Sequence, residues 1–338
     1  MIHSTRFMLQ SDNKIRLKTR LAPTPSGFLH IGNGASFVAT WALARAYEGQ
    51  ILLRIDDLDA ERMRAEYVDD IFRTLDWLGL DWDEGPFSTD DFSENWSQHL
   101  RLDAYEKALQ DLQKTGDLYV CNCSRKDIRE RSTNGLYPNT CRQNRLNASA
   151  EMSNYEKNTA WRILVEADKR VSFKNAEKID LPKKNRDKLL SINGIFDDKN
   201  AFYKHFEVNL SEKMGDFIVR QKNGLPSYQV ASLVDDAFFD INFIVRGEDL
   251  LYSTAAQIFL AERLNQAVFL ATTFWHHPLI ADDNGSKLSK SEGAASLAAL
   301  RESGHSAAIV VREAAKWLGF SDFEGETAAD LVDLIRKY

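Results

Sequence analysis

The sequence has 338 residues, which at about 150 residues per domain predicts two domains, or one large domain with an insertion. Hydrophobic residues make up 43% of the chain and aromatic residues 11%, with only 7 prolines, so the composition excludes a disordered or fibrous protein. There are 43 basic and 50 acidic residues, for a net charge of −7. This acidic balance excludes nucleic-acid binding over the whole surface but is compatible with one local basic groove.

The sequence favours a protein that is neither exported nor inserted into a membrane. Residues 1–10 contain no apolar stretch of signal-peptide length, and polar residues and Pro278 interrupt the longest uncharged stretch, 264–281. The three cysteines lie between Cys121 and Cys141, which suits a metal site better than a secreted disulfide framework. We expect a soluble, cytoplasmic and monomeric protein in a reducing compartment.

The first part of the chain alternates strand and helix patterns. Residues 14–22 alternate polar and apolar side chains, as a strand does, and lead into the turn-forming run 23–27. Helical patterns follow over 35–47 and 65–78, and the apolar run 51–55 between them predicts a buried parallel strand. The order of strand, glycine turn, helix, strand and helix predicts an α/β fold that begins as a Rossmann-type, doubly wound parallel sheet.

The second part of the chain predicts an insertion and a helical end. Residues 168–223 form a charged tract with weak periodicity, which we assign to an inserted, largely peripheral subdomain. The apolar run 243–245 predicts another buried strand. Further helical patterns occupy 102–115, 253–264 and 294–338. The predicted domains are a first Rossmann half (1–115), an inserted cysteine-bearing subdomain (116–215), a second Rossmann half (216–291) and a helical C-terminal portion (292–338).

The turn between the first strand and the first helix carries an imidazole and glycines. In the run 25–34, His30 and three glycines lie where free backbone N–H groups and the helix dipole favour an anion. Glycine lets a nucleotide approach the backbone closely, and a histidine can hydrogen-bond a phosphate oxygen. For this run alone, a tight turn with a satisfied histidine is the alternative.

A second polar run, 285–291, contains two lysines three residues apart, Lys287 and Lys290, among glycine and serine residues. Lysines on a flexible loop can follow a polyphosphate as charge develops on it in a transition state. For this run alone, a solvated loop without a role is the alternative.

Together, the two runs resemble the two signature motifs of class I aminoacyl-tRNA synthetases. His30-Ile31-Gly32-Asn33 is similar to the first motif, with Asn33 in place of its second histidine, and 287–291 is similar to the second, with Leu288 in place of methionine. Over residues 16 to about 300, further runs resemble the glutamyl and glutaminyl branch of this family: 19–27, 53–57, Tyr228, 234–236 and 245–249. The resemblance implies a Rossmann-type domain that activates an amino acid with ATP and Mg²⁺.

The resemblance also implies two sets of binding residues. ATP would be held by His30, Gly32, Asn33, Lys287, Ser289 and Lys290, and the amino acid by Arg20, Ala22, Thr24, Asp56, Tyr228 and Arg246. Arg20 and Arg246 can donate to two substrate carboxylates, and Asp56 can accept from an ammonium group. A structural ion pair at the strand end is the alternative role for Arg20. Asp56 suits glutamyl and glutaminyl enzymes alike, but a glutamine amide would leave guanidinium donors partly unpaired, so we expect glutamate.

The sequence places three thiolates and one phenol close together: Cys121, Cys123, Tyr137 and Cys141. No histidine lies nearby to complete a metal site. Three cysteines gathered by chance in one hairpin are the alternative. The Cys-x-Cys and Tyr-x-x-x-Cys spacing is similar to the zinc site of the glutamyl-queuosine tRNA(Asp) synthetases, in which tyrosine is the fourth ligand. This resemblance implies one structural zinc ion in the inserted subdomain.

Only 47 residues follow Ser291, whereas a full glutamyl-tRNA synthetase continues with anticodon-binding domains of about 150 residues or more. We therefore expect the stand-alone branch. It would form glutamyl-adenylate from ATP and L-glutamate without tRNA, and transfer the glutamate to the queuosine base in the anticodon of tRNA(Asp). The alternatives are a shortened glutamyl-tRNA synthetase that charges the 3′ end of tRNA(Glu), and a non-catalytic, zinc-bearing RNA-binding relative.

Overall fold

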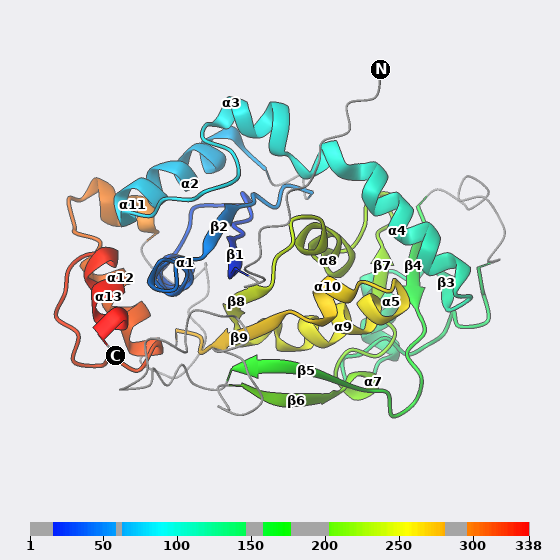
Figure 1. The fold of residues 1–338 in the computed structure, drawn as a ribbon. Coiled ribbons are helices and arrows are strands. Elements are labelled where there is room, and N and C mark those ends of the chain that lie inside the picture. Colours follow the sequence, from blue (N-terminus) through cyan, green and yellow to red (C-terminus); the bar gives the residue numbers. More distant parts are fainter. Residues whose placement is uncertain (1–15, 59–62, 147–157, 177–202, 281–295, 338) are drawn as a thin grey trace, which may run out of the picture.

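The computed structural model describes residues 16–58, 63–146, 158–176, 203–280 and 296–337 (Figure 1). Strands form a central layer with helices on both of its faces. Neighbouring residues of one strand therefore belong to opposite cores: Leu53 and Val245 pack on the side of the first helix, and Leu52 and Ile244 pack on the other side. Strands covered on both faces are apolar throughout, which explains the predicted strand runs 51–55 and 243–245.

The N-terminal unit follows the predicted order of strand, turn, helix, strand and helix. β1 and β2 are parallel, with Arg20 opposite Leu52. α1 begins earlier than the sequence predicts, because His30 is its N-cap residue and the Asn33 side chain accepts a hydrogen bond from the His30 backbone at 3.1 Å. The elements are β1 (Lys18–Leu21), α1 (Ile31–Ala46), β2 (Gln50–Leu53) and α2 (Ala65–Leu78).

A second set of strands continues this layer in the order β6-β5-β9-β8. β8 lies beside β1, where the Asn242 backbone N–H donates to the Lys18 carbonyl at 3.0 Å. β8, β9 and β5 are parallel, whereas β6 is antiparallel to β5. The predicted doubly wound parallel sheet is therefore a mixed sheet, because β6 is antiparallel, as is common in large sheets of this class. The strands are β5 (Arg170–Ala176), β6 (Tyr203–Asn209), β8 (Phe243–Gly247) and β9 (Thr273–His277).

The expectation that the charged tract 168–223 is peripheral is wrong for β5. Val171 and Phe173 of this strand are buried in the core, while the alternating residues Arg170 and Ser172 are exposed. β5 is thus half-buried, and its exposed charged residues conceal the strand when the tract is judged by composition.

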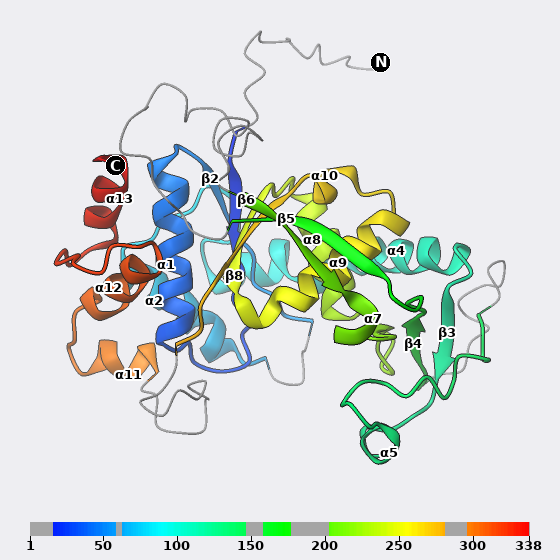
Figure 2. The same cartoon turned by 90° about the horizontal axis from the view of Figure 1, so that it is seen from below.

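A small antiparallel sheet, β3-β4-β7, carries the cysteines. Figures 1 and 2 both place it at one end of the molecule, far from the C-terminal helices. Its strands come from the predicted insertion and from 218–220 just beyond it, and the domain boundaries stay predictions. The elements here are β3 (Leu118–Cys121), α5 (Arg125–Arg131), β4 (Ala160–Ile163) and β7 (Ile218–Arg220).

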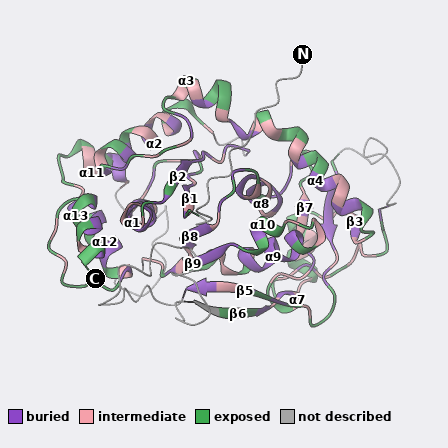
Figure 3. Ribbon diagram, viewed as in Figure 1, coloured by how far each residue is buried: buried purple, intermediate pink, exposed green. Residues whose placement is uncertain are grey.

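The remaining helices cover the two faces of the strand layer, with buried inner sides and exposed outer sides (Figure 3). α12 and α13 pack on α1, and the elements that the structure gives for residues 296–337 are helices, while the predicted domain bounds stay predictions. The helices on the α1 side include α11 (Leu297–Glu302), α12 (Ala308–Trp317) and α13 (Ala328–Lys337). Those on the other side include α4 (Leu102–Lys114), α8 (Tyr228–Phe238), α9 (Leu251–Arg263) and α10 (Ala267–Leu270). Short elements are α3 (Thr89–Asp91), η1 (Phe92–Trp96), η2 (Gln98–Arg101), α7 (Leu210–Lys213) and η5 (Glu248–Leu250).

Within the five described ranges, no helix has both the length and the apolar character that crossing a bilayer requires. The predicted cytoplasmic location and monomeric state remain predictions.

Two adjacent aspartates of α8, Asp235 and Asp236, are fully buried. Asp235 accepts two hydrogen bonds from Arg101, at 2.9 and 3.2 Å, and one each from Gln98 and Tyr105, both at 2.8 Å. Burial acts to raise the pKa of Asp235, but the charges of Arg54 and Arg101 and the hydrogen bonds from Arg101 and Gln98 outweigh it and hold this pKa below its usual range. The ionised carboxylate therefore ties α8 to η2 and α4.

We expect Asp235→Asn to lower the free energy of unfolding by about 3–5 kcal/mol at neutral pH, because it leaves Arg101 buried without its counter-ion. A carboxylate with a depressed pKa stabilises the fold above its unfolded-state pKa, about 3.9, and loses that contribution as the pH falls through the folded-state value. The gap between wild type and Asp235→Asn should therefore narrow below about pH 4 in urea titrations. The control is Asp111→Asn, an exposed partner of Lys107 and Lys114, with an expected cost under about 1 kcal/mol. Equal costs for the two variants would contradict the prediction.

Candidate active site

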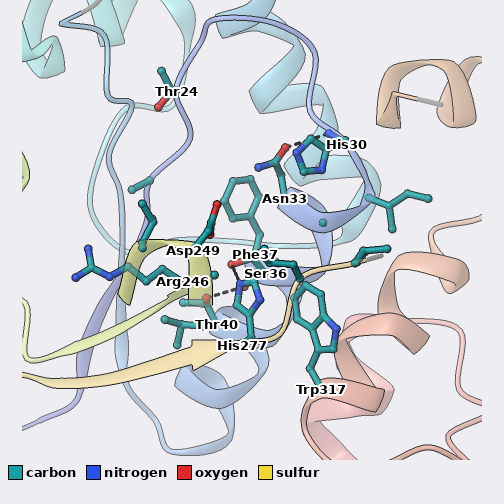
Figure 4. Close-up of a pocket in the computed structure, with 18 of the residues that line it drawn as sticks. Thr24, His30, Asn33, Ser36, Phe37, Thr40, Arg246, Asp249, His277 and Trp317 are labelled. Atoms are coloured by element: carbon teal, nitrogen blue, oxygen red, sulfur yellow. Dashed lines mark hydrogen bonds between the residues drawn. The ribbon is translucent and has the colours of Figure 1, made fainter. Parts of the chain in front are cut away.

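A pocket of about 720 Å³ lies where the C-terminal ends of β1 and β8 meet the first turns of α1 (Figure 4). Ligands bind α/β sheets at such places, where helices and loops diverge from the strand ends. The structure brings into it every predicted ATP- or glutamate-binding residue that it describes: Arg20, Ala22, Thr24, His30, Gly32, Asn33, Asp56, Tyr228 and Arg246. The other three, Lys287, Ser289 and Lys290, lie outside the described residues. The roles given to all of these residues stay predictions.

One end of the pocket is the N-terminus of α1. The Asn33 side chain closes the first turn on the His30 backbone, and the Asn33 and Gly34 N–H groups donate back to the His30 carbonyl at 2.9 and 3.2 Å. A Cβ atom on Gly32 would lie 3.1 Å from the His30 ring, so a larger residue would push the imidazole aside. The turn thus presents a helix N-terminus and an imidazole to the pocket, an arrangement that attracts anions.

Arg54, a residue to which sequence reasoning gave no role, organises the opposite wall. It donates to both oxygens of Asp56, at 2.7 and 3.1 Å, and to Asp236 at 2.7 Å. Burial nevertheless raises the pKa of Asp56, against the lowering effect of Arg54. Arg54 follows β2 directly. The sequence does not show which side chains it contacts, because these contacts depend on how α8 packs against this strand.

Arg20 belongs to the same network. Its Nε donates to Asp236 at 3.2 Å and one Nη donates to the Val245 carbonyl at 3.2 Å. The alternative role as an ion-pair partner at the strand end is therefore present in the structure. It is compatible with ligand binding, because a guanidinium group has five N–H donors and these two contacts leave others available.

Arg246 differs from Arg20 and Arg54 in having no carboxylate partner among the described residues. It is only 4% exposed, and one Nη donates to Thr254 and, at 2.8 Å, to Gln257. Among the residues that the structure describes, its Nε and other Nη have no hydrogen-bond partner, and burial lowers its pKa. A buried, unneutralised guanidinium is costly unless an anion pairs with it. The pocket therefore has a place for a carboxylate at Arg246.

His276 holds Arg246 in position through Thr254. Its ring nitrogens lie 2.7 Å from the Thr254 hydroxyl and 2.7 Å from the Asn175 side-chain oxygen. Burial and the nearby charge of Arg246 lower the pKa of His276 to about 2, so the ring is neutral at physiological pH. A neutral ring that donates to Asn175 accepts from Thr254, which leaves the Thr254 oxygen free to accept from Arg246. His276 and Asn175 were missed because nothing in their local sequence marks this chain of contacts.

A third side of the pocket comes from segments far apart in the sequence. The His277 ring stacks on Trp317 of α12, with centroids 4.1 Å apart and planes 9° apart, and lies 2.9 Å from the Ser36 hydroxyl. Figure 4 shows His277 between Ser36 and Trp317. Sequence reasoning missed all three residues, since the contact joins α1, the end of β9 and the C-terminal helices.

The cysteine cluster lies at the β3 end of the small sheet. The Sγ atoms of Cys121, Cys123 and Cys141 lie within 4.8 Å of one another, and the Tyr137 hydroxyl is 3.4 Å from Cys121 and 3.9 Å from Cys123. Tetrahedral zinc with Zn–S bonds of about 2.3 Å needs sulfur atoms roughly 3.8 Å apart, so these donors fit such a group. Burial raises the pKa of Tyr137, and Cys121 and Cys141 add to this effect through hydrogen bonds. A phenolate here would therefore need a cation beside it.

Residues 16–337 match the family described as tRNA synthetases class I (E and Q), catalytic domain. The chain belongs to this family. It is 36% identical over 318 residues to the "Glutamyl-Q tRNA(Asp) synthetase" of Cupriavidus metallidurans, covering 90% of this chain and 89% of that relative. It is 34% identical over 326 residues to "Glutamate--tRNA ligase 2" of Syntrophus aciditrophicus, covering 96% of this chain and 62% of that relative. The family prediction is confirmed.

The fold is also similar to solved structures. A glutamate tRNA ligase from Elizabethkingia meningosepticum superposes with a TM-score of 0.67 at 21% identity, over 96% of this chain and 64% of that one. At this identity the likeness shows the class I catalytic fold. The chain spans about three fifths of the length of the glutamate–tRNA ligases that it matches.

We expect Arg246→Met to keep the free energy of unfolding within about 1 kcal/mol of wild type, because it removes an unneutralised buried cation along with its two hydrogen bonds. The control, Arg54→Met, should cost about 3–5 kcal/mol, because it leaves Asp56 and Asp236 without their shared partner. Urea denaturation measures both. A loss above about 3 kcal/mol for Arg246→Met would show that Arg246 is part of the framework and not a place for a ligand.

Proposed function

We propose that the pocket forms glutamyl-adenylate from ATP and L-glutamate without tRNA. The observation that carries this proposal is the buried Arg246 guanidinium without a counter-ion, which suits a substrate carboxylate. Arg246 would pair with the side-chain carboxylate, which glutamine lacks. Arg20 would donate to the other carboxylate, and Asp56 would accept from the ammonium group. Glutamine would place a neutral amide beside one of the two guanidinium groups and leave it uncompensated, so glutamate is the preferred substrate.

ATP would lie along the α1 side of the pocket. The N-terminus of α1, with His30, Gly32 and Asn33, would bind its phosphates, and Mg²⁺ would neutralise the remaining charge. Lys287 and Lys290 belong to the run 285–291 of the sequence. They would stabilise the negative charge that develops on the phosphates as pyrophosphate leaves. The glutamate carboxylate would then be held close to the α-phosphate, which converts a bimolecular reaction into an intramolecular one.

The accepting group would be a hydroxyl of queuosine in the anticodon of tRNA(Asp). Two observations support this choice. Tyr137 lies with Cys121, Cys123 and Cys141, which is the donor set expected for this branch. A relative named glutamyl-Q tRNA(Asp) synthetase is also 36% identical to the chain. The 34% identity to a glutamate–tRNA ligase keeps charging of tRNA(Glu) as the second candidate.

Transfer of labelled glutamate tests this choice. The substrates are tRNA(Asp) with queuosine, the same tRNA(Asp) without queuosine, and tRNA(Glu), and pyrophosphate exchange without tRNA is measured in parallel. We expect exchange that depends on glutamate, and label only on the queuosine-containing tRNA. Label only on tRNA(Glu) would establish the second candidate, and a lack of exchange would favour the non-catalytic relative.

We further propose one structural zinc ion at Cys121, Cys123, Tyr137 and Cys141, since four protein ligands leave no position for a reacting water. Elemental analysis should give one zinc per chain. Cys141→Ser should lose zinc and destabilise the β3 hairpin, and Tyr137→Phe should bind zinc at least about tenfold more weakly. The matched control is Thr140→Val, next to the cluster but outside the ligand set, which should keep its zinc. A metal-free wild-type protein with unchanged stability would contradict the proposal.

A further inference from the structure

A second groove, of about 440 Å³, adjoins the pocket. Tyr228 lines both, so the two cavities border the same residue. The groove runs between the N-terminus of α8 and the cysteine-bearing sheet, and Tyr137, Arg162, Asp216 and Ser227 also line it. None of these four residues was given a role in adenylate formation.

The N-terminus of α8 lacks its usual cap. Ser227 is the N-cap residue, but its side chain makes no capping hydrogen bond, and its hydroxyl has no partner in the part of the chain that the structure describes. Ser227 is 6% exposed, so its side chain is largely removed from bulk solvent. A serine at this position normally bonds a backbone N–H of the first turn. Here both the hydroxyl and the first N–H groups of an 11-residue helix remain for a ligand, and a helix N-terminus favours an anion.

Arg162 is a buried cation at the same groove. It is 6% exposed, lies 3.7 Å above the Tyr137 ring and donates to the Asp216 backbone carbonyl at 2.7 Å. Its Nε is buried without a partner, and no ion pair joins it to a carboxylate in the described part of the chain. The Asp216 carboxylate is already engaged by Arg142, at 2.7 and 2.8 Å. Among the described residues, the groove thus combines a guanidinium without a carboxylate partner, a hydroxyl without a hydrogen-bond partner and a helix N-terminus.

We propose that this groove binds a backbone phosphate of the tRNA next to the nucleoside that accepts glutamate. The inference rests on the proposed function, which makes RNA the second substrate and phosphate its only anion. Phosphate contacts fix the register of a nucleic acid on a protein without reading its sequence. A phosphate held beside Tyr228 would set the distance between the RNA chain and the glutamate pocket, and so choose which nucleoside reaches the adenylate.

The proposal is tested by measuring the affinity of the Arg162→Gln and Ser227→Ala variants for tRNA at salt concentrations from about 50 to 200 mM. Loss of one phosphate-neutralising cation should reduce the slope of log affinity against log salt by about 0.7–0.9 for Arg162→Gln. Ser227→Ala removes an uncharged donor, so it should weaken binding by about tenfold with an unchanged slope. Both variants should keep glutamate-dependent pyrophosphate exchange. Ser227→Ala should also keep or raise the melting temperature, because it deletes an unsatisfied buried hydroxyl.

Arg220→Gln is the matched control. Arg220 lies on β7 opposite Trp161, over whose ring it packs, and has an unpartnered Nε, but it does not line the groove. Its variant should therefore keep the wild-type salt slope. The proposal is overturned if Arg162→Gln and Arg220→Gln change the slope equally, or if Ser227→Ala binds tRNA like wild type. Absence of glutamate-dependent exchange in the wild type would instead overturn the proposed function, so the two failures are distinguishable.

Discussion

The pairing of buried aspartates with buried arginines is the constraint on which the rest of the structure depends. Asp235 and Asp236 are adjacent and fully buried, and Arg101, Arg54 and Arg20 supply the positive charges and hydrogen bonds that offset the cost of burying them. These contacts join α8 to β1, to the end of β2 and to η2. They also fix Asp56, because Arg54 holds it with the same guanidinium that contacts Asp236. The walls of the pocket are thus positioned by electrostatic pairing across segments as much as by apolar packing.

Two buried arginines are not part of this framework of paired charges. Arg246 and Arg162 are both buried, both lack a carboxylate partner among the described residues and both line a cavity. A folded protein gains nothing in stability from such groups, since an unpaired buried cation opposes folding. Their positions suit the binding of anionic groups of the substrates: a carboxylate at Arg246 and a phosphate at Arg162.

Much of this could be predicted from the sequence, and the failures have physical causes. The β1–α1–β2 unit was predictable because its signals are local: a period-two run, a glycine turn and an apolar run. Nine predicted binding residues line the pocket, and the sequence revealed them because they lie in short motifs. Arg54 and Asp235 were given no role because each pairs with a residue more than 100 positions away, Asp236 and Arg101 respectively. Trp317 was missed because it reaches the pocket only through the packing of α12 on α1. β5 was missed because exposed charges alternate with its buried residues.

The central claim is that the unpaired Arg246 guanidinium selects a second carboxylate. Calorimetric titration of the wild-type protein with L-glutamate and with L-glutamine, without ATP or tRNA, tests it most directly. We predict that glutamate binds at least about tenfold more tightly, equivalent to about 1.4 kcal/mol, and that Arg246→Met removes the difference while the protein stays folded. Equal affinities for the two amino acids in the wild type, or a preference that survives Arg246→Met, would contradict the account.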